Sequence, residues 1–212
     1  SLDLSLNELD PIKLSTAQSV IVFPKDGEIL LQKNRNFLFE GAISAGKAEI
    51  YLKNGAFDYD NFKINLTEVT AALLRVRPIY NGGNNLIPMT SYIASFEGEL
   101  LIDKDNNKSG NNRKITNYQI LSTKKNSYVY YNHPSIYNGT YDSTTFYFKL
   151  DPFEFDSLDN FREQNVAFTG EMRSSGIFPV FKEKISIQED YAFGFKTKAP
   201  TEGYRFYGND AK

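Results

Sequence analysis

The chain has 212 residues, of which 15% are aromatic, all of them Phe (17) or Tyr (14), and it contains no Cys and no Trp. This composition provides enough apolar residues for a folded core and excludes an intrinsically disordered chain, a disulfide scaffold and thiol chemistry. A net charge of −2 without a cluster of Lys and Arg argues against nucleic acid as the main partner.

Length and hydropathy predict one domain over 1–212, because nothing in the middle of the chain resembles a linker. No apolar run approaches the roughly 20 residues of a membrane helix, so we expect no transmembrane segment. Ser1 and Leu2 without a starting Met indicate an expressed fragment of a longer protein, and the lack of a signal peptide is then uninformative. We expect 1–18 to be a loosely held arm or a first edge strand.

The first predicted hairpin joins 20–23 to 29–31 through Asp26-Gly27, a dipeptide that favours the tight turn between two strands. In this register Phe23 would face Leu30. Pro24 cannot donate to a strand ladder, so the hairpin should lie at a sheet edge.

The strongest local signal is Asn54-Gly55, which lies between two alternating apolar stretches. Asn-Gly readily adopts the positive φ angles of a type I′ turn, so we predict a second hairpin here. Its register would place Ile50, Leu52, Phe57 and Tyr59 on one face, as a half-buried antiparallel pair requires. The apolar phase then shifts by one residue, which predicts a bulge or corner at Asp60-Asn61.

A Phe-x-Gly pattern recurs at Gly41, Gly98 and Gly170, each preceded two residues earlier by Phe. The unequal intervals exclude a solenoid with a fixed period. We expect each glycine to lie where the backbone passes close to a neighbouring strand.

The remaining chain alternates strands and polar loops. We predict 68–77 to be a strand in spite of some helical character, 81–85 and 103–113 to be loops, and Asp156 to cap one short helix at 157–164. Further strands are predicted at 91–102, 114–121, 127–131, 166–173, 177–181, 184–187 and 191–196, with a Tyr-rich hairpin within 135–150. Together these elements predict an all-β fold of antiparallel hairpins in layered sheets, either sandwich-like or an open stacked array, with at most one short helix.

Metal chemistry has one candidate, the run Asp103, Asp105 and Asn107, which has the alternate spacing of a calcium loop. Lys108 and Lys114 occupy the positions where such a loop has Gly and a bidentate Glu, so a solvated loop is the favoured interpretation and an adventitious calcium ion the alternative. We expect no cofactor.

Catalytic candidates are weak. His133 is the only histidine, and no Gly-x-Ser-x-Gly sequence accompanies it, so we assign it a structural or solvated position. Carboxylate pairs occur at Asp58 with Asp60, and in a second group. That group comprises Asp151, Glu154, Asp156 and Asp159. Strand alternation and the predicted helix start explain both, and we assign no catalytic residue.

Tyrosines are dense in one region and predict a stacking surface for a glycan or another ligand with an apolar face. The lack of Trp and the ordinary use of Tyr in strands count against this hypothesis. The candidate ligand-binding residues are Tyr128, Tyr130, Tyr131, Tyr137, Tyr141 and Tyr147.

Six segments are distinctive: the run 32–46 with its Phe39-x-Gly41, the run 57–66, and the stretches 106–110, 127–131, 134–139 and 156–161. Together they resemble an internal segment of very large, uncharacterised cell-envelope or secreted proteins of Bacteroidetes-type bacteria. The resemblance covers about 17–208 and implies a mostly β piece of a long protein in the cell envelope or secreted. It implies no catalytic residues.

These observations predict a non-enzymatic structural or interaction module of a large bacterial envelope-associated or secreted protein. Its partners would be neighbouring segments of the parent protein or other envelope proteins, with self-association through exposed sheet edges. One alternative is a glycan- or acyl-chain-binding module with a Tyr-lined surface. A second alternative is a carbohydrate-active enzyme that uses a carboxylate pair.

Overall fold

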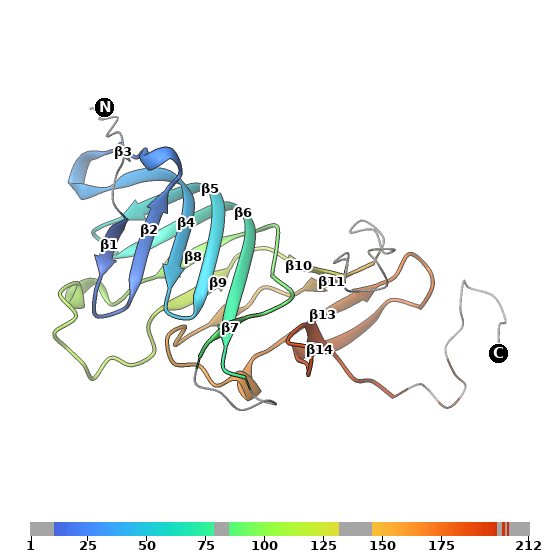
Figure 1. Ribbon diagram of the computed structural model, residues 1–212. Coiled ribbons are helices and arrows are strands. Elements are labelled where there is room, and N and C mark those ends of the chain that lie inside the picture. The colour runs from blue at the N-terminus through green and yellow to red at the C-terminus, as the bar shows by residue number, and fades with distance from the viewer. Residues whose placement is uncertain (1–10, 79–84, 132–145, 199–200, 202, 204–212) are drawn as a thin grey trace.

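The computed structural model describes residues 11–78, 85–131, 146–198, 201 and 203, and within them the chain is all-β. Two antiparallel sheets, one of ten strands and one of five, account for the fold (Figure 1). No helix of the described residues exceeds a single short 3₁₀ turn. The predicted fold class is therefore confirmed.

The ten-stranded sheet, the larger sheet, has the order β1-β2-β4-β5-β6-β8-β9-β12, with β3 paired to β4 and β7 paired to β6. Its strands are β1 (Ile12–Ser15), β2 (Val20–Pro24), β3 (Leu30–Leu31), β4 (Phe37–Ala45), β5 (Ala48–Asp58), β6 (Lys63–Val76), β7 (Ile87–Pro88), β8 (Phe96–Leu101), β9 (Ile120–Thr123) and β12 (Glu154–Phe155).

The five-stranded sheet, the smaller sheet, has the order β10-β11-β13-β14-β15. Its strands are β10 (Ser127–Tyr130), β11 (Tyr147–Leu150), β13 (Ala167–Arg173), β14 (Phe181–Ile187) and β15 (Phe193–Gly194). Single 3₁₀ turns are η1 (Lys25–Gly27), η2 (Lys33–Arg35), η3 (Asp105–Asn107) and η5 (Glu163–Asn165).

The larger sheet curls, so that β8 and β9 lie behind β2 and β4 (Figure 1). A hydrogen bond of 2.6 Å from Nε2 of Gln18 to Oδ2 of Asp103 joins the β1–β2 turn to the segment after β8. The amide of Lys47 donates to the carbonyl of Leu158 at 2.8 Å. Both contacts close the curl around apolar side chains, including the fully buried Ile43 and Ile64.

Asn54 and Gly55 form no turn, so the predicted hairpin is wrong. Both residues lie inside β5, where Asn54 pairs with Thr67 of β6 and Gly55 pairs with Phe39 of β4. A Cβ atom on Gly55 would meet the ring of Phe39 at 2.4 Å, so this glycine provides room for an aromatic ring. The alternation was nevertheless correct, because Ile50, Leu52 and Phe57 are buried.

The actual reversals flank β5. The β4–β5 turn consists of Gly46 and Lys47, and Gly46 has the positive φ of 58° that glycine adopts without strain. The β5–β6 turn spans 59–62 and contains Asp60-Asn61, where a bulge or corner was predicted.

Three register shifts lie side by side across the middle of the larger sheet. They occur opposite Glu40 between β4 and β5, after Tyr51 between β5 and β6, and between Leu66 and Val69 where β6 meets β8. Glu68 has φ 53° there, as a bulged residue can. We call this line of bulges the crease.

Asp26-Gly27 does form a tight turn, with φ angles of 55° and 70°, but β2 and β3 do not pair with each other. Both pair with β4 instead, since Phe23 lies opposite Ala42 and Leu30 opposite Leu38. The predicted pairing of Phe23 with Leu30 is therefore wrong. The long strand β4 offers more hydrogen-bonding partners than the short β3 could.

The predicted strand at 68–77 is confirmed as the second half of β6, and β1 provides ordered edge structure within the predicted arm. The short helix at 157–164 is wrong. Ser157 has φ 53°, which ends any helical start, and only η5 follows. Leu158 and Phe161 still face inward, as predicted, and are buried. Loop residues 81–84 lie outside the described residues.

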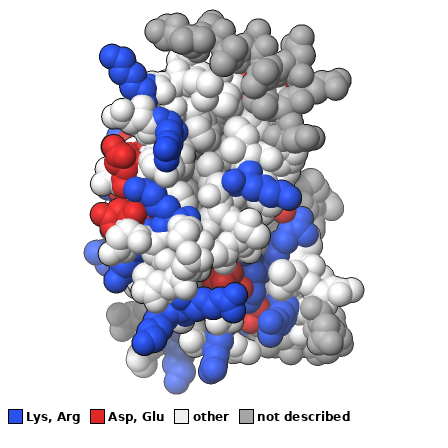
Figure 2. Space-filling model, turned by 90° about the vertical axis from the view of Figure 1, so that its left-hand side faces the viewer, with Lys and Arg blue, Asp and Glu red and all other residues white. Residues whose placement is uncertain are grey.

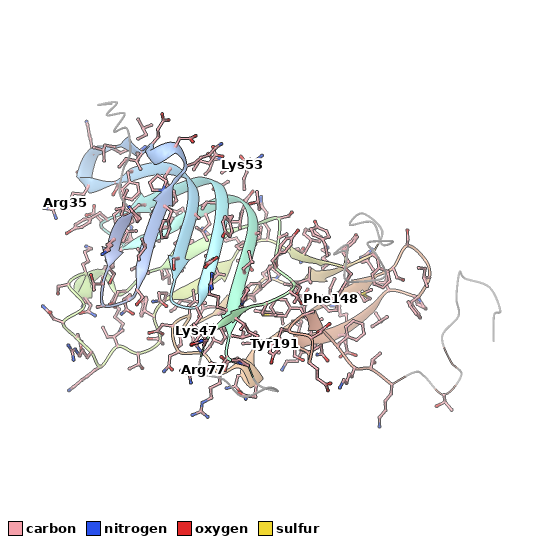
Figure 3. All side chains as sticks on the ribbon, viewed as in Figure 1. Arg35, Lys47, Lys53, Arg77, Phe148 and Tyr191 are labelled. Atoms are coloured by element: carbon pink, nitrogen blue, oxygen red, sulfur yellow. The ribbon has the colours of Figure 1, made fainter. Side chains whose placement is uncertain are left out.

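One contiguous cluster of buried apolar side chains extends through both sheets, from Val20 and Ile50 in the larger sheet to Phe148 and Ile185 in the smaller one. Figure 3 shows Phe148 within the smaller sheet. The segment between β7 and β8 is also joined to the smaller sheet, by a hydrogen bond from the amide of Phe193 to Oγ of Ser91 at 2.7 Å. The smaller sheet is therefore packed against the larger one as part of one core.

Candidate functional site

β10 and β11 place three of the six candidate tyrosines on the outward side of the smaller sheet. Val129 and Phe148 alternate with them and are fully buried. Tyr128 and Tyr130 share the outward side of β10, and Tyr147 of β11 pairs with Tyr130. We call the rings of Tyr128, Tyr130 and Tyr147 the tyrosine face.

The three rings pack against each other. Tyr128 and Tyr130 are stacked, with centroids 6.0 Å apart and an interplanar angle of 6°. Tyr147 meets both rings edge-on, at 5.7 Å from Tyr128 and 6.3 Å from Tyr130. Each such aromatic pair contributes about 0.5–1.5 kcal/mol beyond the area that it buries. The rings are therefore held in place before any ligand arrives.

Tyr131 is not brought into the tyrosine face. It follows Tyr130 directly, so it points to the other side of the strand, where its ring packs edge-on against Phe146 at 5.8 Å. Burial, with a smaller contribution from Asp190, raises the pKa of its hydroxyl far above the usual range. Tyr137 and Tyr141 lie outside the described residues.

An open depression of about 820 Å³ begins beside Tyr128 and extends over the larger sheet to Lys53. Lys125, Asn126 and Pro152 line its near end. A second depression of about 810 Å³ continues from Lys53 toward β3. Sites of this size accommodate small ligands, although an apolar ligand requires a more enclosed and less charged pocket.

The candidate calcium residues are only partly brought together. Asp103 is buried, and its Oδ2 accepts hydrogen bonds from Gln18 at 2.6 Å and from Nδ2 of Asn107 at 2.9 Å. Its Oδ1 accepts from the amide of Lys104 at 2.7 Å, while Asp105 is exposed. No group of three acidic, His or Cys side chains suited to a metal occurs in the part of the chain that the structure describes.

Asp58 has a structural role in the β5–β6 turn. It accepts hydrogen bonds from the amide and the side-chain Nδ2 of Asn61, at 3.1 and 2.7 Å. The side-chain hydrogen bond is the main cause that lowers the pKa of Asp58, and Lys63 adds to it. Asp60 is exposed in the same turn. This pair therefore stabilises a turn.

The second group of carboxylates is spread over three locations. Glu154 and Asp156 lie two residues apart at an open depression of about 390 Å³, and both are exposed. Asp151 accepts a hydrogen bond from Thr169 at 3.4 Å. Asp159 lies against Gly46 at the β4–β5 turn. His133 lies outside the described residues.

Figure 2 shows the end of the molecule opposite the smaller sheet, where Lys and Arg gather over the lower half with a few Asp and Glu among them. Arg35 of η2 and Lys108 from the loop after β8 both lie 4.8 Å from the centre of the Tyr59 ring. The sequence showed no positively charged face, because folding brings these cations together from distant segments.

Sequence reasoning also missed the charged neighbours of the tyrosine face. Arg173 of β13 pairs with Tyr147, and its Nη2 donates to Glu171 at 2.8 Å. The signal was present in the strand alternation, since Met172 is buried and its two neighbours must then point outward with the tyrosines.

No protein family, no curated protein and no solved structure matches this chain. Within the described residues, no helix is long and apolar enough to cross a membrane.

Proposed function

We propose that this chain is a non-enzymatic interaction module of a larger bacterial envelope-associated or secreted protein, and that it binds a glycan on the tyrosine face. The observation that carries the proposal is the mutual packing of Tyr128, Tyr130 and Tyr147 on the outward side of the smaller sheet.

Preordered rings favour binding because little side-chain freedom remains to be lost when a ligand arrives. Each tyrosine offers an apolar ring and a polar hydroxyl, which match the CH face and the hydroxyls of a sugar. Inward packing does not require these rings, since Val129 and Phe148 already fill the core side of the same strands.

The depression beside Tyr128 favours a glycan over an acyl chain. It is open, and Glu68, Glu97, Lys124 and Lys125 contribute charged groups to its lining. An acyl chain would remove water from these charged groups, whereas sugar hydroxyls can bond to them. An extended glycan on the tyrosine face would continue into this depression.

The carboxylates favour binding over hydrolysis. A glycosidase needs two carboxyl groups that face each other about 5 to 9 Å apart across the sugar. Asp58 is instead bound to Asn61, and Asp60 next to it is exposed. The candidate acids therefore support turns and solvated surfaces.

The test is a screen of neutral and acidic oligosaccharides by thermal shift, followed by calorimetry with Tyr130→Ala and Tyr147→Ala. A bound glycan should raise Tm, and either substitution should weaken its binding about tenfold, the equivalent of about 1.4 kcal/mol. Tyr51→Ala is the matched control, because Tyr51 is an exposed strand tyrosine of the larger sheet.

Two results would overturn the proposal. A flat response to every glycan would leave the chain with a purely structural role. Equal losses in Tyr130→Ala and Tyr51→Ala would place the binding surface elsewhere.

A further inference from the structure

The strand registers place cations directly beside the tyrosine face. Tyr128 pairs with Lys149 across β10 and β11, and Tyr147 pairs with Arg173 across β11 and β13. Side chains paired in this way have Cβ atoms about 4.5–5.5 Å apart and interact directly. Each of these two tyrosines therefore has a cation as its neighbour on the next strand.

The row of Tyr128 extends further across the sheet. Lys149 pairs with Glu171, and Glu171 pairs with Lys182 of β14. Lys184 lies two residues further along β14 on the same outward side, because the next residue, Ile185, is fully buried. The outward positions of β11, β13 and β14 thus hold four cations and one acid. The cations are the lysines 149, 182 and 184 with Arg173.

Acids offset only part of this charge. Asp151, which follows β11 on the same outward side, accepts a hydrogen bond from Thr169, the residue opposite Lys184. Glu171 accepts the hydrogen bond of Arg173 at 2.8 Å, and none of the three lysines joins an ion pair among the described residues. This hydrogen bond lowers the pKa of Glu171, with further contributions from Lys149 and Lys182. The face therefore has a local excess of positive charge on a chain whose net charge is −2.

We infer that the ligand of the tyrosine face is an acidic glycan, whose sugar rings pack on the tyrosines while their carboxylates pair with Lys149, Lys182 and Lys184. The inference rests on the proposed function and adds the ligand class. Charge-assisted hydrogen bonds from Lys and Arg to carboxylates are stronger than neutral ones and give specificity for the acidic sugar.

Single-stranded nucleic acid also combines stacking with charge, but the face suits it less well. Bases stack face to face on aromatic rings, and the tyrosine rings are covered in part by one another, which leaves less open ring surface for bases.

The experiment compares short oligogalacturonates with their methyl esters, which keep the sugar backbone and lose the charge. Calorimetry at low and high salt is run on the whole chain, on Lys182→Gln/Lys184→Gln and on Lys13→Gln/Lys33→Gln. The control pair is exposed and lies in β1 and η2, away from the smaller sheet. The unchanged chain should bind the acidic form about tenfold more tightly than the ester. High salt should reduce this preference. Lys182→Gln/Lys184→Gln should also reduce it, whereas Lys13→Gln/Lys33→Gln should leave it unchanged.

Other outcomes would separate the acidic ligand class from the proposed function. Equal binding of acid and ester, lost in Tyr130→Ala, would overturn the acidic class and keep glycan binding. Binding of neither, together with a flat glycan screen, would overturn the proposed function as well. Tighter binding of an oligothymidylate than of the uronate, lost in the same variants, would assign the face to nucleic acid.

Discussion

Three glycines determine how closely neighbouring strands approach each other. A Cβ atom on Gly98 would lie 2.1 Å from the carbonyl oxygen of Ser122, and one on Gly170 would lie 2.1 Å from that of Lys149. Gly41 has φ 146°, and a Cβ there would meet the carbonyl oxygen of Phe23 at 2.2 Å. The Phe-x-Gly pattern predicted these close passages, because glycine in a strand has few other reasons to recur.

Gly98→Ala should lower the free energy of unfolding by about 3 kcal/mol, since backbone atoms would have to move to admit the methyl group. Gly176→Ala is the control, because nothing lies within 4 Å of that Cβ position and only the φ of 84° opposes it. Its cost should be about 1 kcal/mol. Urea unfolding of both variants measures the difference, and equal midpoints would contradict the close approach.

A buried ion pair closes the lower end of the larger sheet, where Lys47 and Arg77 lie close together (Figure 3). Nζ of Lys47 lies 3.4 Å from Oε1 of Glu163, donates to the carbonyl of Phe161 at 2.9 Å, and lies over the Phe161 ring. Glu163 also accepts the amide of Arg77 at 3.0 Å. Burial acts to raise the pKa of Glu163, but these partners outweigh it and lower the pKa.

Lys47→Met should cost about 3 kcal/mol or more at neutral pH, because it leaves the Glu163 carboxylate buried without its cation. Glu163→Gln should cost less, since the amide oxygen can still accept from Arg77. Chemical denaturation of the two variants should preserve this order. A larger loss of unfolding free energy in Glu163→Gln than in Lys47→Met would contradict this order, and would show that the charge of Glu163 contributes more to stability than the charge of Lys47.

Acid should weaken the fold in part through Glu163. A carboxyl whose pKa is lower in the folded state stabilises it above the unfolded value of about 4.3, and this contribution is lost as pH falls from about 5 through the folded value. Glu163→Gln should therefore flatten the decline of stability with acid. Gln164→Ala, an exposed neighbour without charge, should leave the decline unchanged.

At the scale of elements, long-range pairing overrides local turn preference. Asn54-Gly55 favours a turn in isolation, yet β5 continues through it, because Asn54 pairs with Thr67 of β6 and Gly55 pairs with Phe39 of β4. The alternation of Ile50, Leu52 and Phe57 could be predicted from the sequence, since it depends only on neighbouring residues. The site of reversal could not, because it depends on strands far along the chain.

The segment from Leu158 to Asn165 replaces the predicted helix and acts as a plug against the β4–β5 turn. The side chain of Leu158 is fully buried, and its carbonyl accepts the amide of Lys47 at 2.8 Å. A Cβ atom on Gly46 would meet the backbone of Asp159 at 2.5 Å. The plug and the turn therefore fit together with little free space.

Leu158→Ala should lower the free energy of unfolding by about 3 kcal/mol, as cavities at fully buried leucines do. Hydrogen exchange should show faster opening at Gly46 and Lys47, since the plug holds that turn. Asp159→Ala is the control, because its side chain is exposed. Unchanged exchange at Lys47 would mean that the plug and the turn are independent.

At the scale of the whole molecule, both sheets share one core. Buried side chains run without a break from Val20 to Phe193, and the bridge between Ala94 and Tyr128 joins the segment before β8 to β10. The layered antiparallel sheets could be predicted from the sequence, but the strand order could not, because pairing between distant segments leaves no local pattern. The single domain over 1–212 stays a prediction. Self-association through the sheet edges stays a prediction.

The shared core predicts that both sheets unfold in one transition. Phe148→Ala, in the smaller sheet, should lower the free energy of unfolding by about 3 kcal/mol. It should lower the Tm of the larger sheet by as much as that of the smaller sheet. Hydrogen exchange on peptides from β4–β5 and from β13–β14 measures this, with Thr169→Ala as an exposed control. Two separate transitions would divide the chain into two units.

The crease gives the larger sheet a preferred line of bending. Its bulges interrupt the ladders of β4, β5 and β6 at the same level, so hydrogen bonding is weakest along that line. Asn54 and Glu68, hydrogen-bonded at 2.8 Å, lie on its outer side. In mechanical terms we expect the crease to be the most compliant line of the larger sheet, so that a load applied across the molecule would bend the sheet there first.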